Sequence, residues 1–222
     1  MLTDILLVAH IVVLGYWLGA EFVINSEYRY VSRSAGMPFA ERARLMEHVM
    51  DVDQHVRYAL VLQAGLGTTI AARLGYLPGG EVLAWFAAAV GILWLGFVEV
   101  THRARHASVG NFLSRLDRAI RYLLLVGLTA IALLALTGGG LQNVPTWLAW
   151  KLLLFAGVIL SGVGIRLALV RFFRLWKEIR DGGSSDEREA QIRFIYVYAT
   201  SILGVLWLFI GGIVVLSVLK PW

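Results

Sequence analysis

Six apolar stretches of about 20 residues, separated by turns and charged segments, dominate this sequence. In lipid, helices are one of only two structures that satisfy all their own backbone hydrogen bonds, and about 20 helical residues cross the hydrocarbon core. Hydrophobic residues make up 59% of the chain and charged residues 16%, whereas about a quarter of a soluble domain is charged. The sequence therefore predicts an all-α, polytopic membrane bundle of six transmembrane helices in a single domain, residues 1–222. The predicted spans are Leu2 to Ile24, Val56 to Leu77, Val82 to Val100, Ile120 to Thr137, Trp147 to Val170 and Phe194 to Leu219.

The basic residues predict the orientation of these spans. Of the 20 lysines and arginines, only Arg73, Lys151 and Lys220 fall on the side that holds the two termini. Cytoplasmic loops carry the excess of basic residues, so we expect a multi-pass protein of the inner (cytoplasmic) membrane with both termini on the non-cytoplasmic side. The first span lacks a basic n-region and a small-residue cleavage site, which favours a mature span over a signal peptide.

An amphipathic segment follows the first span. From Pro38 onward, Phe39, Ala43, Met46, Met50 and Asp53 share one side of a helix, and we expect this helix to lie along the membrane interface. Asp53 is the one charged member of that side. Its predicted partner in a structural ion pair is Arg57, one turn later.

A shift of 64 residues places Arg57-Tyr58 on Arg121-Tyr122, Leu60 on Leu124 and Gly75 on Gly139. These matches predict a parallel repeat of two helical hairpins, 56–100 and 120–170. The alternative is a coincidence between two similar hydrophobic hairpins.

His10 lies about midway along the first predicted span, where hydrocarbon makes an ionisable imidazole costly. At 100° per residue, Thr3, His10, Trp17 and Glu21 fall in one narrow sector, so we expect this stripe to face protein. One interpretation is a core histidine that is hydrogen-bonded to a neighbouring helix. The other is a ligand to haem iron or another metal, or a proton carrier.

Histidines and carboxylates at helical spacing suggest a second site on the basic side. Glu-x-x-His pairs on facing helices hold the metals of di-iron bundles, so iron, copper or zinc are the alternative cofactors. The ordinary alternative is a set of solvated helix faces and helix ends. The candidate ligands are Glu99, His102 and His106 at the end of the third span, Glu21 on the first, and His48, Asp51 and His55 on the amphipathic segment.

Four short motifs resemble one group of membrane proteins. His10 followed by Trp17 and Gly19 resembles the first span of CopD-type and HemJ-type proteins. Residues 40–50 (AERARLMEHVM) are similar to the interfacial helix of HemJ-type protoporphyrinogen oxidases, and residues 147–154 (WLAWKLLL) to the Trp-and-Lys start of one of their spans. Residues 214–222 (VVLSVLKPW) resemble their Lys-Pro-aromatic terminus. The resemblance implies a tetrapyrrole or metal site built from His10 and Lys151.

The expected function is that of a redox membrane protein that binds haem b or a porphyrin through His10, with Lys151 and Trp17 shaping the pocket. Lys151 and His10 lie in the same outer half, within about 10 Å in depth. The chain has no cysteine, and no second histidine lies at that depth, so Lys, Met, water or a second subunit would complete the iron site. The alternatives are a non-haem metal oxidoreductase that uses the second site, and a metal transporter or structural membrane subunit.

The expected partners follow from the same observations. The lipid bilayer is one, and a second copy of the chain or a membrane electron-transfer protein is another. We expect no nucleic acid, because the basic residues are spread along helix ends and form no recognition motif.

Overall fold

Six long helices make up the fold, with no strand in the part of the chain that is described. The computed structural model describes residues 1–104, 107–139, 141 and 144–220. All helices except α2 are long and apolar enough to cross a membrane, which agrees with a multi-pass helical membrane protein. The helices are α1 (Leu2–Arg33), α2 (Phe39–Arg73), α3 (Gly80–Arg103), α4 (Gly110–Leu136), α5 (Thr146–Gly182) and α6 (Asp186–Leu219).

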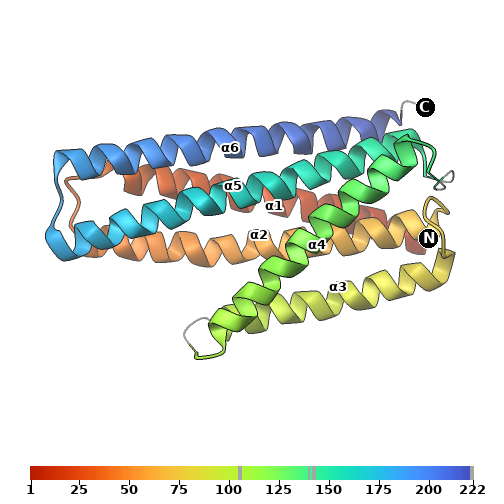
Figure 1. Cartoon of the computed structure of the whole chain (residues 1–222), viewed down its shortest axis with the longest axis horizontal. Helices are drawn as coiled ribbons and strands as arrows, with labels where there is room; N and C mark the ends of the chain where they lie inside the picture. The colour runs from red at the N-terminus through yellow and green to blue at the C-terminus, as the bar shows by residue number, and fades with distance from the viewer. Residues whose placement is uncertain (105–106, 140, 142–143, 221–222) are drawn as a thin grey trace.

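The helices run back and forth, so that both chain ends lie at one end of the molecule, here called the terminal end (Figure 1). α1, α2, α5 and α6 have 32, 35, 37 and 34 residues, whereas α3 and α4 have 24 and 27. At 1.5 Å per residue the long helices reach about 48 to 56 Å, well beyond the hydrocarbon thickness of about 30 Å. They project past the turn between α3 and α4, away from the termini (Figure 1). We call this projection, about residues 24–55 and 168–199, the headpiece, and its side of the molecule the basic end.

One continuous helix replaces the predicted interfacial helix and second span. Residues 39–73 form α2 without a break, so the prediction of a separate segment along the membrane surface is wrong. The apolar side of its first half packs into the headpiece core instead, where Met46 and Val49 are buried together with Phe172 and Ile192. The physical reason is tertiary, because α5 and α6 project equally far and offer this side a protein core in place of lipid.

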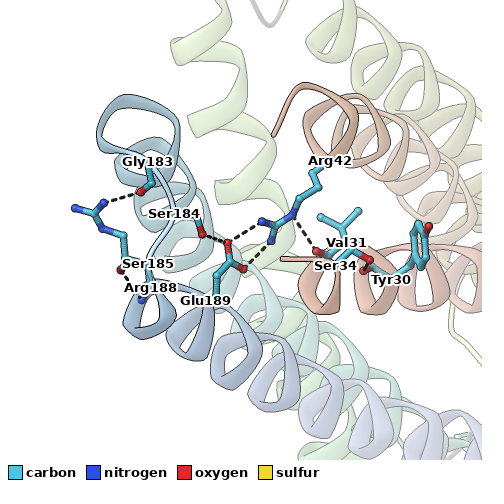
Figure 2. A network of polar contacts seen from close by, with 9 residues as sticks. All are labelled: Tyr30, Val31, Ser34, Arg42, Gly183, Ser184, Ser185, Arg188 and Glu189. Atoms are coloured by element: carbon cyan, nitrogen blue, oxygen red, sulfur yellow. Dashed lines mark hydrogen bonds and ion pairs between the residues drawn. The ribbon is translucent and has the colours of Figure 1, made fainter. Parts of the chain in front are cut away.

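A buried ion pair ties the headpiece together (Figure 2). Two guanidinium nitrogens of Arg42 donate to the two carboxylate oxygens of Glu189, at 2.7 and 2.9 Å. Arg42 Nε also donates to the carbonyl oxygen of Val31 at 3.2 Å, and Ser184 Oγ donates to Glu189 Oε1 at 2.6 Å. Only 2% of the Arg42 side chain and 4% of the Glu189 side chain are exposed. The pair therefore links α2 to both α1 and α6 inside the headpiece.

The closest backbone packing lies within two groups of three helices, α1–α2–α3 and α4–α5–α6. The groups meet where α1 contacts α6 and, less extensively, where α3 contacts α4. Within the second group, glycines let α5 and α6 approach each other, since a Cβ at Gly157 would lie 2.8 Å from the Phe209 ring. We call the interface between the two groups the seam.

Candidate functional site: an arginine-lined cavity and a partly buried histidine

A cavity of about 500 Å³ opens in the seam between α1, α2, α4, α5 and α6. Most of its wall is apolar, with Leu60, Ile159 and Leu206 among the lining residues. Along α1 it extends from Trp17 to Tyr28, which corresponds to about 16 Å of helix. Its volume falls in the range of pockets that hold small organic ligands, about 300 to 1,000 Å³.

Four arginines line this cavity, which we therefore call the arginine cavity: Arg57 from α2, Arg118 and Arg121 from α4, and Arg166 from α5. Arg166 is within electrostatic range of the other three. Neither Arg118 nor Arg166 forms an ion pair with a carboxylate in residues 1–104, 107–139, 141 or 144–220. The cavity thus contains two guanidinium groups whose charge the described chain leaves without a direct partner.

The other two arginines are paired in the same way. Arg57 donates to Asp53 Oδ2 from Nε at 3.1 Å and from a terminal nitrogen at 3.0 Å, so the ion pair expected from the sequence is present. Arg121 donates to the two oxygens of Asp117, at 3.0 and 3.3 Å. Both pairs are spaced i, i+4, and they are themselves 64 residues apart, which is the offset of the predicted repeat.

Glu21 is a buried carboxylate at the apolar end of the same cavity, with 5% of the residue exposed. Its two oxygens accept hydrogen bonds from the indole nitrogens of Trp17, at 2.7 Å, and Trp207, at 2.6 Å. Trp17 therefore lines the arginine cavity with its indole nitrogen bound to Glu21, and its part in a porphyrin pocket with His10 and Lys151 stays a prediction. Glu21 itself lies in the seam, and none of the other described candidate metal ligands lines the cavity with it.

His10 lies on α1 between the cavity and the terminal end, where it faces α2. Its ring packs against α2 at Gly67, where a Cβ would be 3.4 Å from His10 Cε1, and Gln63 Nε2 donates to its carbonyl oxygen at 2.8 Å. Nδ1 of His10 is buried and has no hydrogen-bond partner among the described residues. Lys151 of α5 is within electrostatic range of the imidazole. Neither His10 nor Lys151 lines the arginine cavity.

The candidate metal ligands on α3 are not gathered into a cluster. Glu99 accepts hydrogen bonds from the Tyr58 hydroxyl and from Arg103, so its carboxylate already has two partners. His102 ends the same helix, and His106 lies outside the described residues. Within the described ranges, no three His, Cys, Asp or Glu side chains are placed to hold a metal ion.

The candidate ligands on α2 point to separate partners. His55 Nδ1 is hydrogen-bonded to the Tyr16 hydroxyl, and His48 Nε2 lies 3.6 Å from Glu27 Oε1. Asp51 is exposed on the same polar side of the helix. All three residues are exposed on one side of the helix.

Arg118 and Arg166, which have no ion-pair partner among the described residues, were not predicted from the sequence as site residues. A signal for the cavity was available, because the predicted repeat extends one turn further back and places Asp53 on Asp117. The pairs Asp53–Arg57 and Asp117–Arg121 stand at corresponding positions of the two repeats, which predicts that they lie at the same level of the bundle. That Arg166 of α5 joins this level follows from packing alone.

Comparison of this chain with protein-family models, with curated proteins and with solved structures finds no match. The likeness to CopD-type and HemJ-type proteins therefore stays a prediction that depends on the four motifs.

Proposed function

We propose that this chain is a six-span membrane redox protein that binds haem b or another porphyrin, with His10 as a ligand and Lys151 beside it. The observation that supports this function is the His10 imidazole, whose Nδ1 is buried and has no hydrogen-bond partner among the described residues. Leaving a buried polar atom without a hydrogen-bond partner costs about 1–3 kcal/mol. A ligand that bound to this imidazole nitrogen would remove that cost.

The residues around His10 fit part of what a porphyrin needs. The imidazole offers a nitrogen ligand for iron, and the Lys151 ammonium offers a cation for a propionate carboxylate. The hydrogen bond from Gln63 to the His10 carbonyl oxygen and the contact with Gly67 fix the helix and the ring in place. When bound, a haem would supply one-electron chemistry, and the role of the chain would be to hold and orient it.

In this proposal α2 also crosses the membrane and brings the number of spans to six, although its hydropathy is lower than that of the other helices. α2 packs against α1 on one side and α3 on another, and Ala59, Val61 and Ala72 are buried. A helix that neighbouring helices shield from lipid needs fewer large apolar residues, and small ones aid packing between helices. The excess of basic residues at the headpiece side supports an inner-membrane orientation with both termini outside the cytoplasm.

Absorption spectroscopy of the purified full-length chain tests this function. We expect a Soret band in the wild-type protein, loss of most bound haem in His10→Ala, and weaker binding in Lys151→Met. His48→Ala is the matched control, because it removes an exposed imidazole from the headpiece. Circular dichroism checks that each variant keeps its helices.

Two results would overturn the proposal in different ways. A wild-type protein that carries no porphyrin, even after expression with excess haem precursor, would reject the function itself. Unchanged haem content in His10→Ala, together with haem loss in an Arg118→Gln/Arg166→Gln variant, would reject His10 and place the porphyrin in the arginine cavity.

A further inference from the structure

We infer that the arginine cavity binds an anionic membrane lipid, with the lipid phosphate on Arg118 and Arg166 and an acyl chain along the apolar wall. This site is separate from His10 and does not depend on the proposed porphyrin. The inference comes from the charge of the cavity, its depth in the membrane and the chemistry of its wall.

The charged residues of the cavity have a net positive charge, which favours binding of an anion. Its four arginines face two lining carboxylates, Asp53 and Glu21, and the neighbouring Asp117. With Glu21 ionised, the net charge of these residues is +1. With Glu21 protonated, it is +2. Arg166 is repelled by Arg57, Arg118 and Arg121 and is attracted by Asp117. A bound anion between Arg118 and Arg166 would replace this repulsion with charge-assisted hydrogen bonds.

The depth of the two unpaired arginines matches that of lipid phosphates. Trp147 marks the start of α5 at the terminal end, and Arg166 follows 19 residues later, about 28 Å along the helix. On α4, Arg118 and Thr137 are separated by the same distance. Because the hydrocarbon core is about 30 Å thick, we place both guanidinium groups towards its other boundary, near the headgroups of that leaflet.

The composition of the wall selects an amphiphile over a soluble ion. Leu60, Ile159 and Leu206 surround the end of the cavity near Trp17, and Phe173 and Leu169 line its headpiece end. A free phosphate ion would leave this apolar surface uncovered, whereas an acyl chain would cover it. The planar guanidinium group is also the side chain best suited to bidentate binding of a phosphate.

Native mass spectrometry of the full chain, purified in a detergent without phosphate, tests this inference. We expect the wild-type protein to bind phosphatidylglycerol more tightly than phosphatidylcholine with the same acyl chains. Arg118→Gln and Arg166→Gln should each weaken phosphatidylglycerol binding by about tenfold, because hydrogen bonds to charged groups are strong. The matched control is Arg115→Gln/Arg171→Gln, which removes the same charge from positions on the same two helices that do not line the cavity.

Arg118→Lys/Arg166→Lys keeps the charge but not the paired donors, so it should bind with intermediate affinity and serves if the glutamine variants fold poorly. Equal loss in the control variant would show that surface charge, and not the cavity, holds the lipid. Inorganic phosphate that displaces the lipid at equal concentration, or a bound molecule without phosphorus, would also overturn the inference. His10→Ala should keep the lipid, which separates this test from that of the porphyrin.

Discussion

Glu189→Gln is the substitution that tests most directly what holds the headpiece together. It keeps the size of the side chain but removes the charge that faces Arg42. The Arg42 guanidinium would then be buried with an amide oxygen, the Val31 carbonyl and the face of Trp176 as partners, the last at 5.0 Å from the ring centroid. No partner in this set carries a negative charge.

The expected cost follows from the burial of the pair. Breaking a buried, hydrogen-bonded ion pair by removing one charge costs about 3–5 kcal/mol. The Val31 carbonyl and the Trp176 ring remain as partners for the guanidinium, so we expect the lower part of this range, about 3 kcal/mol. Replacing both residues, as in Arg42→Met/Glu189→Met, leaves no buried charge and should recover most of the loss.

The pair also predicts a pH dependence. Burial raises the pKa of Glu189, but the hydrogen bonds from Arg42 and Ser184 lower it by more. The net pKa therefore lies below the ordinary value of about 4.3. A carboxyl group with a lowered pKa contributes stability above its unfolded pKa, and this contribution is lost as the pH falls through the folded pKa. Wild type should therefore lose stability below about pH 4 more steeply than Glu189→Gln.

The assay is unfolding of the full chain in mixed micelles with a rising fraction of a denaturing detergent, followed by circular dichroism. A free energy of unfolding for Glu189→Gln within about 1 kcal/mol of wild type would refute the argument, since it lies outside the range for a broken buried pair. An Arg42→Met/Glu189→Met variant that lost as much free energy of unfolding as its two single variants together would also refute the argument. The two side chains would then act independently.

Two further substitutions test the packing of the seam and of α5 against α6. Glu21→Gln should destabilise the chain by about 1–3 kcal/mol and shift tryptophan emission, because its amide nitrogen cannot accept a hydrogen bond from the second indole; unchanged emission and stability would contradict the two-indole arrangement. Gly157→Ala should cost about 1–3 kcal/mol in the same unfolding assay, since its Cβ would lie 2.8 Å from the Phe209 ring. Gly204→Ala on α6, with no atom within 4 Å of the added Cβ, is its control and should be neutral or stabilising.

Much of the fold could be predicted from hydropathy, because lipid imposes its requirement on each span separately. Each predicted span lies mostly within one helix, and α5 begins at Thr146, one residue before the predicted boundary at Trp147. The helices reach further than the spans at the basic end, so that α1 continues from Ile24 to Arg33. Hydropathy predicts only the part of each helix that lies in hydrocarbon. The headpiece extends beyond that part and is stabilised by contacts between helices that are far apart in the sequence.

The candidate site could be predicted only in part. The stripe of His10, Trp17 and Glu21 follows from helical periodicity, and the Asp53–Arg57 pair follows from i, i+4 spacing, so both could be inferred from local sequence. The separate partners of His48 and His55 could not be inferred in this way.

The sequence by itself determined that this chain forms apolar helices of membrane-spanning length, which of their faces are polar, and on which side the basic residues gather. Those properties depend on single residues and on spacings within one helix. Only the tertiary structure decided that Arg118 and Arg166 face one cavity, and that Arg42 of α2 meets Glu189 of α6. Such pairings depend on which helices pack together and at what depth, and no spacing along one helix contains that information.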